Sequence, residues 1–480
     1  MLPFRMARPR LGRVSISTPR IRAQKSYSTK SPSSNRMRSI ATAGAISAPG
    51  LWWLISARDD VPSLEEPPVD HPGIEPGLSQ ERVTELISQE AYSFPVSNIP
   101  GVNRYDGTRL ASNNPCEDQF THGKLPSPFN DGQHWMAWAV FDGHSGWQTA
   151  DLLKRQLLPF VRRSLGLIES SPKKDSVSEE LVQRAIMQGF VNLDDSIFKT
   201  ALDAAQGNKP FHEKVKAFLP VYAGSCALLS LYDPGTSTVH VACTGDSRAV
   251  LGQQTPDGKW EAIPLSVDQT GSNKEEILRL QAEHPGEPEM VKGGRVLGMM
   301  VSRAFGDGPW KWPLDFQQEI KKRFSGPSLL TPRYPVRTPP YLTAEPVVTS
   351  TKINPGRPSF LIMATDGMWD MLTSQQAVNL VGKWIESESA ETRPASTVKP
   401  AYEPFDFGQF WKGVSWRFVE SRSTVQDENA AVHLVRNSLG GDHHELVAGR
   451  LAFSAPHSRR VRDDMTVQVV FFNTPRLKSR

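Results

Sequence analysis

Acidic residues recur along this chain where a carboxylate could meet a metal ion. Five acidic clusters lie next to apolar, strand-like runs: Glu117-Asp118, Asp142-Gly143-His144, Asp246, Asp366-Gly367 and Asp463-Asp464. Converging carboxylates repel one another and raise each other's pKa unless a cation compensates them. Oxygen ligands of this kind suit hard cations such as Mg²⁺ or Mn²⁺. Two such ions that share a bridging carboxylate can activate the water between them.

Each acidic cluster has a simpler interpretation when it is taken alone. Asp-Gly after a strand usually forms a tight turn, and Asp246 could sit in a hairpin tip with a local ion pair to Arg248. Asp463-Asp464 could be a loop that opens a strand, and His144 could be a surface histidine. The order and spacing of all five clusters together favour a metal site.

The elements that would position these residues alternate between strands and helices from about Val83 onward. Apolar runs predict strands at 136–141, 223–232, 239–243, 250–252, 260–263, 360–365 and 466–472. Helical periodicity predicts helices at 147–165, 181–202, 274–283 and 374–384. One face of the second helix should carry Leu181, Ala185, Ile186, Phe190, Leu193 and Ile197. The predicted fold class is α/β (α+β), with antiparallel sheet covered by helices.

The domain organisation follows from shifts in composition. Residues 59–82 are acidic and Pro-rich, which is typical of a linker. We expect one folded domain over residues 83–475. Residues 308–341 and 386–460 carry Pro, Trp and charge without a steady period, so they are interpreted as insertions on that domain.

Composition excludes several classes of protein. The chain has 480 residues, 38% hydrophobic and 22% charged, which excludes collagen, coiled-coil arrays and multi-span membrane proteins. Its three cysteines, at 116, 226 and 243, are too few and too scattered for a disulfide framework or a thiolate zinc site. Residues 1–58 hold 11 Arg or Lys and no acid, which leaves 44 basic against 51 acidic residues elsewhere. This acidic body argues against a nucleic-acid partner.

The N-terminal segment has the composition of a mitochondrial targeting sequence. Residues 1–58 are rich in Arg and Ser and lack acids, and a basic arm without a targeting role is the alternative. Within this segment, residues 40–56 are apolar but interrupted by Gly and Pro, at the short limit for a membrane span. We therefore expect a mitochondrial matrix protein, with anchoring in the inner membrane through 40–56 as the alternative.

Taken in order, the acidic motifs resemble the metal-dependent serine/threonine protein phosphatases of type 2C, the PPM-type family. The matching segments are Glu117-Asp118, AVFDGHSG (139–146), GSCALLSL (224–231), TGDSRAVL (244–251), RVLGMMVSRAFGD (295–307), ATDGMWD (364–370) and RDDMTV (462–467). The resemblance implies a β-sandwich of two antiparallel sheets flanked by helices, with the metals at one end. It also implies an enzyme that hydrolyses phosphoserine or phosphothreonine in proteins.

The resemblance assigns metal-binding roles to five positions. Asp142 would bridge two Mg²⁺ or Mn²⁺ ions. Glu117 and the carbonyl of Gly143 would complete one metal site. Asp366 and Asp463 would complete the other. The attacking group would then be a water activated by both metals, and no covalent phospho-enzyme is implied.

Further roles follow from the same resemblance. Asp118 would steady water at the metals, and Asp246 with Asp366 resembles the site of a third, weaker metal. His144 would be the general acid that protonates the leaving seryl or threonyl oxygen. Many members of the family hold the substrate phosphate with an arginine at the position of Asn113, so Asn113 is only a weak candidate for a phosphate contact. Which basic residue binds the phosphate stays open.

A narrower resemblance points to a substrate. RYDGTRLASNNPCEDQF (104–120), EEILRLQAEHPGEP (275–288), WKWPLDFQQ (310–318), TPPYLTAEPVVT (338–349) and DENAAVHLVRNSLGG (427–441) are similar to the mitochondrial pyruvate dehydrogenase phosphatases. That subgroup also has asparagine at the position of Asn113. The implied substrate is phosphoserine on the E1 component of the pyruvate dehydrogenase complex.

Three alternatives were weighed against this function. The first keeps the chemistry and acts on another mitochondrial phosphoprotein. The second is a non-catalytic regulator with the same fold, which the retained Asp142, Asp366 and Asp463 disfavour. The third, a nucleotide-hydrolysing enzyme, should show a glycine-rich phosphate loop, and the sequence has none.

Overall fold

The computed structural model describes residues 77–129, 131–168, 178–389 and 418–474. The expected targeting sequence and the apolar stretch 40–56 lie outside the described residues. Within the described ranges, no helix combines the length and the apolar character that a membrane span needs. The described chain begins inside the expected linker, where helix α2 (Gln80–Ser88) already starts with Ser79 as its N-cap.

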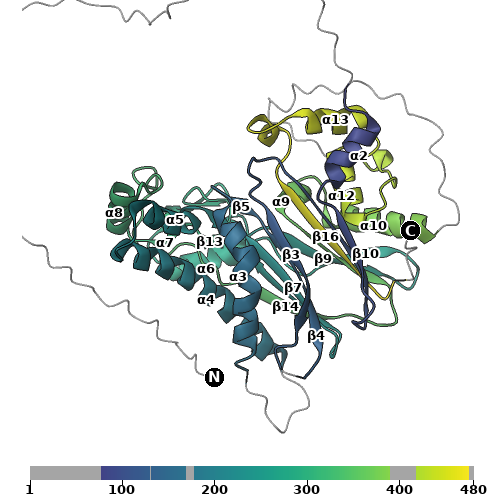
Figure 1. Ribbon diagram of the computed structural model, residues 1–480, viewed down its shortest axis with the longest axis horizontal. Helices are drawn as coiled ribbons and strands as arrows, with labels where there is room; N and C mark the ends of the chain where they lie inside the picture. The colour runs from purple at the N-terminus through teal and green to yellow at the C-terminus, as the bar shows by residue number, and fades with distance from the viewer. Residues whose placement is uncertain (1–76, 130, 169–177, 390–417, 475–480) are drawn as a thin grey trace, which may run out of the picture. The chain divides into compact units, whose positions relative to one another are not determined.

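Two antiparallel sheets form the frame of the fold (Figure 1). The six-stranded sheet has the order β1 (Tyr92–Pro95), β2 (Val102–Leu110), β16 (Met465–Phe472), β15 (Ser359–Ala364), β9 (Arg248–Gln254) and β10 (Trp260–Pro264). The five-stranded sheet has the order β14 (Val347–Lys352), β8 (Thr238–Thr244), β7 (Ala227–Asp233), β4 (His134–Phe141) and β3 (Gln119–Pro126). Short strands make two small sheets: β13 (Phe305–Gly306), β6 (Gly224–Ser225) and β5 (Gly143–His144), and the pair β11 (Val291–Lys292) and β12 (Arg295–Val296).

Helices cover the outer face of each large sheet (Figure 1). The five-stranded sheet is covered by α3 (Gln148–Leu165), α4 (Glu179–Gln206) and α5 (Phe211–Tyr222). The six-stranded sheet is covered by α2, α10 (Ser374–Ser389), α12 (Ala430–Leu439) and α13 (His444–Ala452). The remaining helices are α6 (Lys274–Glu283), α7 (Gly308–Lys311), α8 (Leu314–Phe324) and α9 (Asp366–Trp369), with short 3-10 turns η1 (Pro288–Met290), η2 (Glu420–Arg422) and η3 (His457–Arg460).

Side-chain alternation along the central strands builds three cores. In β15, Leu361 and Met363 enter the core between the two sheets, while Phe360 and Ile362 pack against the helices. In β4, Trp138 enters the core between the sheets and its neighbours on either side face α3 and α4. Strands that are buried on both faces are apolar throughout, which explains why the sequence identified them readily.

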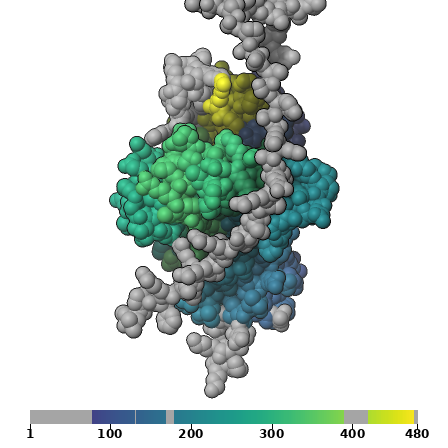
Figure 2. All heavy atoms as spheres, turned by 90° about the vertical axis from the view of Figure 1, so that its left-hand side faces the viewer, coloured from purple at the N-terminus to yellow at the C-terminus, as the bar shows by residue number. Residues whose placement is uncertain are grey.

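The chain between β10 and β14 lies at one end of this frame. It contains α6, α7 and α8, and Figure 2 shows its green atoms gathered on the face turned toward the viewer. Ile320 and Phe324 of α8 pack into the core beneath α5. The expected insertion 308–341 is therefore tied to the frame by apolar contacts.

The structure confirms the expected sandwich class and corrects three details of the sequence interpretation. Leu181 is 45% exposed, and Val182 takes the buried place in α4. β7 begins at Ala227, because Gly224–Ser225 pairs separately with β5 and β13. The region 386–460, interpreted as an insertion, contains α12, whose residues are all buried and which packs on β2 and β16. Its polar side chains, among them Arg436 and Asn437, are buried and bonded within the protein, so polar residues in this stretch did not mark a surface segment.

Candidate metal centre

Three carboxylates meet at one edge of the two large sheets. Asp142 directly follows β4, Asp246 lies in the turn between β8 and β9, and Asp366 is the first residue of α9 after β15. One carboxylate oxygen from each lies within 4.8 Å of the others. The structure thus brings together three of the predicted ligands from strands that are far apart in the sequence.

The three carboxylates are poorly compensated by the described protein. Burial raises the pKa of Asp142, and the neighbouring Asp366 raises it further. Burial, followed by the charge of Asp366, raises the pKa of Asp246 to about 7. Burial also raises the pKa of Asp366, which shares a hydrogen bond with Asp142. Buried oxygens that resist ionisation without a cation are a suitable donor set for a hard divalent ion.

Asp118 lies deeper than these three residues and is held in one orientation. Its Oδ2 accepts hydrogen bonds from the hydroxyls of Thr365 at 2.9 Å and Thr466 at 2.8 Å. Burial, and then the charge of Asp464, raises its pKa to about 8. Because both threonines come from the ends of β15 and β16, Asp118 is fixed to the same edge as the metal ligands.

Asp464 holds the loop that carries Glu117. Its Oδ1 accepts from the backbone N–H of Asn113 at 2.8 Å, and its Oδ2 accepts from the N–H of Glu117 at 2.9 Å. The side-chain amide of Asn113 also donates to Oδ2 of Asp464 at 2.9 Å and lies 3.4 Å from Oε2 of Glu117. Asn113, the weak candidate for a phosphate contact, is therefore engaged in fixing this loop.

Two glycines permit the close approach of the Glu117 loop and the β16 loop to the strand ends. A Cβ at Gly143 would lie 2.3 Å from the carbonyl oxygen of Glu117. A Cβ at Gly367 would lie 2.1 Å from the carbonyl oxygen of Asp464. Both distances are shorter than any real contact of a Cβ, so only glycine fits at these two positions without movement of the backbone.

Glu117 and Asp463 border the group of three carboxylates without joining it. Burial raises the pKa of Glu117. Oδ1 of Asp463 accepts from the backbone N–H of Asp464, and the same oxygen forms an ion pair with Arg459. The sequence placed both residues among the ligands, and the structure places both beside the centre.

His144 has a buried acidic partner that the sequence analysis did not assign. Its Nε2 lies 2.8 Å from Oδ2 of Asp307, the residue before α7. Burial lowers the pKa of His144, but the charge of Asp307 and the hydrogen bond to it outweigh burial and raise the pKa overall. The imidazole side chain is 27% exposed, while the Asp307 side chain is only 1% exposed. The pair can therefore present a protonated nitrogen to a group outside the protein.

Residues that orient the side chains of the site, rather than bind a ligand themselves, were not predicted from the sequence. Asp307 lies in the quoted segment 295–307, and Thr365 directly precedes Asp366, yet neither has a chemical pattern of its own. Cys226 is also such a residue, because its Sγ donates to Oδ1 of Asp246 at 3.3 Å and so orients one of the three carboxylates. The sequence offered one indication of their roles, which is that they lie within or next to the motif segments.

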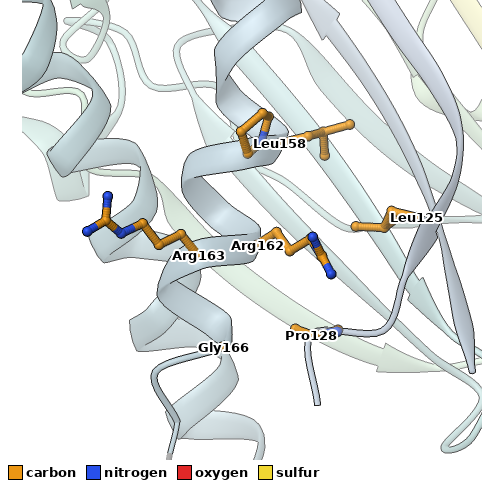
Figure 3. Close-up of a pocket in the computed structure, with 7 residues that line it drawn as sticks. Leu125, Pro128, Leu158, Arg162, Arg163 and Gly166 are labelled. Carbon is orange, nitrogen blue, oxygen red and sulfur yellow. The ribbon is translucent and has the colours of Figure 1, made fainter. Parts of the chain in front are cut away.

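A hollow of about 480 Å³ lies away from the metal centre (Figure 3). It is bordered by Leu125 of β3, by Pro128 just after that strand, and by Leu158, Arg162 and Arg163 of α3. Its lining contains no carboxylate, so it does not contribute to the chemistry described above.

The comparisons with known proteins agree with this site. Residues 104–403 match the family model described as protein phosphatase 2C, and the chain belongs to this family. It is a protein serine/threonine phosphatase, and its family is metal-dependent.

Three curated relatives place the chain within the family. A protein phosphatase 2C homologue of Schizosaccharomyces pombe is 41% identical over 85% of this chain and 86% of its own length. The mitochondrial pyruvate dehydrogenase phosphatase 1 of Saccharomyces cerevisiae is 34% identical over 82% of this chain and 73% of its own length. The human enzyme of the same name is 29% identical over 83% of each chain. The chain is thus similar both to a generic family member and to pyruvate dehydrogenase phosphatases.

Proposed function

We propose that this protein is a mitochondrial, Mg²⁺- or Mn²⁺-dependent phosphatase that removes phosphate from phosphoserine on the E1 component of the pyruvate dehydrogenase complex. The observation that carries the chemistry is the group of half-buried carboxylates from Asp142, Asp246 and Asp366. The observation that supports the target is the similarity to two phosphatases named for pyruvate dehydrogenase.

The chain's carboxylates would hold two divalent cations and a third, weaker one. Asp142 is the best candidate for the bridging ligand, because it shares a hydrogen bond with Asp366 and one of its oxygens lies within 4.8 Å of an oxygen of Asp246. Glu117, the carbonyl of Gly143 and Asp463 border the group and complete the proposed donor set. When bound, the cations supply an activated water for attack on phosphorus and neutralise charge on the phosphoryl oxygens.

His144 would serve as the general acid for the leaving oxygen. An alkoxide from serine is a poor leaving group, so proton transfer to it lowers the barrier. Asp307 keeps the imidazole protonated and oriented through the 2.8 Å contact at Nε2. Asp118, fixed by Thr365 and Thr466, offers an oxygen behind the carboxylate group that could orient water there.

The location proposed for this phosphatase is the mitochondrial matrix. The basic, acid-free segment 1–58 and the mitochondrial relatives both support it. The apolar stretch 40–56 leaves inner-membrane anchoring as a variant of the same proposal. A fusion of residues 1–58 to a reporter tests the address directly, and a reporter that stays in the cytosol contradicts it.

The target is tested with the full chain and phosphorylated pyruvate dehydrogenase. Phosphate release would be followed with Mg²⁺ or Mn²⁺, with a chelator as control, beside an unrelated phosphoserine protein. We expect metal-dependent release that strongly favours pyruvate dehydrogenase. Equal release from both proteins would support phosphatase activity but contradict pyruvate dehydrogenase as the target, in favour of another mitochondrial phosphoprotein. No release from either, with the protein folded, would favour a non-catalytic regulator.

A further inference from the structure

Apart from the imidazole of His144, which is proposed as the acid, the assigned residues supply no cationic side chain that could bind a phosphoryl group at this centre. The side-chain amide of Asn113 is already bonded to Asp464, as described above. Phosphate dianions are bound most strongly by charge-assisted hydrogen bonds, above all from the planar guanidinium of arginine. An arginine suited to this role would reach the carboxylate group and remain accessible to the substrate.

Most arginines near the centre are committed to other partners. Arg248 forms a two-point ion pair with Asp268, with distances of 2.9 and 2.5 Å, and lies over the Trp369 ring. Arg109 is bonded to Glu90. Arg462 is buried and donates to the carbonyl oxygens of Arg450, Phe453 and Ala111. None of these three can turn toward a substrate without breaking its present bonds.

Arg459 differs from these arginines in exposure and in position. It lies in η3, four residues before Asp463, and its side chain is 45% exposed. Its guanidinium contacts the Asp463 carboxylate at the border of the centre. Its charge also lowers the pKa of Glu117 and of Asp366, so it lies within electrostatic range of both sides of the centre.

The turn that carries Arg459 is fixed to the metal-ligand loop. The hydroxyl of Ser458 donates to the carbonyl oxygen of Ser112 at 2.5 Å, and Ser458 is buried. The backbone N–H of Arg462 donates to the carbonyl of Ser458 at 3.0 Å. Arg459 therefore projects from a backbone that is attached on one side to the Glu117 loop and on the other to Asp463.

We propose that Arg459 binds the non-bridging oxygens of the substrate phosphoryl group and of the phosphate product. Asp463 is a proposed metal ligand, so the guanidinium would exchange this carboxylate for phosphate oxygens. The inference rests on the proposed phosphatase chemistry but does not depend on which phosphoprotein is the target. The competing role is structural, in which Arg459 only neutralises Asp463 in the protein without metal.

The two roles predict different binding behaviour. Binding of inorganic phosphate to the full chain at saturating Mg²⁺ would be measured by calorimetry, and Mg²⁺ binding would be measured separately. We expect Arg459→Ala to weaken phosphate binding about ten-fold or more, since a hydrogen bond between charged groups is lost. Mg²⁺ binding should stay equal or become tighter, because a competing cation is removed. Arg459→Lys should lose less, and Arg460→Ala, the neighbouring exposed arginine, should bind phosphate like the wild type.

Hydrolysis of p-nitrophenyl phosphate provides an independent measurement. In Arg459→Ala, inhibition by inorganic phosphate should weaken by the same factor, and KM should rise more than kcat falls. Unchanged phosphate binding in Arg459→Ala, or a loss of Mg²⁺ affinity as large as the loss of phosphate affinity, would overturn the inference. If the wild type hydrolyses this substrate and Arg459→Ala is inhibited by phosphate as strongly as the wild type, the inference on Arg459 is wrong and the proposed function still stands. If the folded wild type neither hydrolyses p-nitrophenyl phosphate nor binds phosphate, the proposed function is contradicted as well.

Discussion

Two acidic sites in this fold, the buried Glu276 and the half-buried carboxylates of the metal centre, differ in what compensates their charge. Glu276 of α6 accepts hydrogen bonds from Arg303 at 2.7 and 3.0 Å and from Arg279 at 2.8 Å. Burial raises the pKa of Glu276, but the bonds from Arg303 and then Arg279 outweigh burial and lower the pKa to about 2. Among the described residues, no Arg or Lys makes a hydrogen bond or ion pair with the three carboxylates of the metal centre, and their pKa values are raised.

The contrast separates a structural acid from a functional one. A buried carboxylate that is paired with arginine is complete within the protein, and removing it leaves a buried cation. A group of half-buried carboxylates that makes no bond to an Arg or Lys has its negative charge compensated only when a cation binds. Removing the carboxylate of Glu276 should therefore lower the stability of the fold. Removing that of Asp142 should instead lower the catalytic rate.

The largest expected effect is on catalysis. Asp142→Asn should lower kcat on the order of a thousand-fold or more, because the proposed bridging ligand is lost. The metal-free variant should unfold at the same temperature as the wild type or higher, since one of the repelling carboxylates is gone. Steady-state kinetics with Mn²⁺ and thermal unfolding with chelator check both parts. A variant that keeps most of its turnover would contradict the bridging role.

The second expected effect is on stability. Glu276→Gln should lower the free energy of unfolding by about 3–5 kcal/mol, because Arg303 and Arg279 lose a buried partner. Urea denaturation measures this loss, and Glu275→Gln, at the exposed neighbouring position, is the matched control. Metal affinity should not change in either variant. A Glu276→Gln protein as stable as its control would remove the distinction between the two clusters.

Opposite pH dependence should accompany these two clusters. The lowered pKa of Glu276 contributes stability above the unfolded-state value of about 4.5 and loses it as pH falls toward 2. The raised pKa values of Asp246, about 7, and Asp118, about 8, mean that the metal-free protein loses stability as pH rises from the unfolded-state value of about 3.8, and that this loss ends at about pH 8. Stability measured between about pH 5 and pH 8 should fall with chelator present and change less with Mg²⁺ present. A flat curve with chelator would show that these carboxylates ionise without cost.

A smaller effect is expected for His144, the proposed general acid. His144→Ala should slow release of phosphate from phosphoserine protein by about a hundred-fold, since proton donation to a poor leaving group is lost. Hydrolysis of p-nitrophenyl phosphate, whose leaving group needs little protonation, should slow far less. Parallel assays on the two substrates check the ratio. Equal losses on both would argue against His144 as the general acid.

The sequence predicted the carboxylates better than their supports. Asp142 and Asp366 follow apolar strands, so their place at a sheet edge could be inferred from strand endings alone. Asp307 lies more than 160 residues from His144, and no local pattern links them. Asp464 was grouped with Asp463 as a ligand motif, but its role in holding the loop of Asn113 and Glu117 depends on a contact across about 350 residues.

The same limit applies to the fold. Doubly buried strands such as β15 and β16 are apolar runs and were predicted within a residue or two. Strands β2 and β3 were not predicted, because their residues are mixed in polarity and both contain Thr, Gly and a basic residue. Helix α12 buries His433, Arg436 and Asn437, polar residues that a sequence pattern assigns to the surface. Tertiary burial rather than local pattern decides these elements.

Direct titration of Mn²⁺ into the metal-free full chain tests most directly whether the uncompensated carboxylates form a cation site. Calorimetry at pH 7 should detect at least two bound Mn²⁺ ions and proton release on binding, because the raised pKa values leave protons on the carboxyls. Asp142→Asn should bind far more weakly, and Glu276→Gln should bind like the wild type at a temperature where it is folded. If Asp142→Asn binds Mn²⁺ as tightly as the wild type, or if the wild type binds none, the account of the metal centre is wrong.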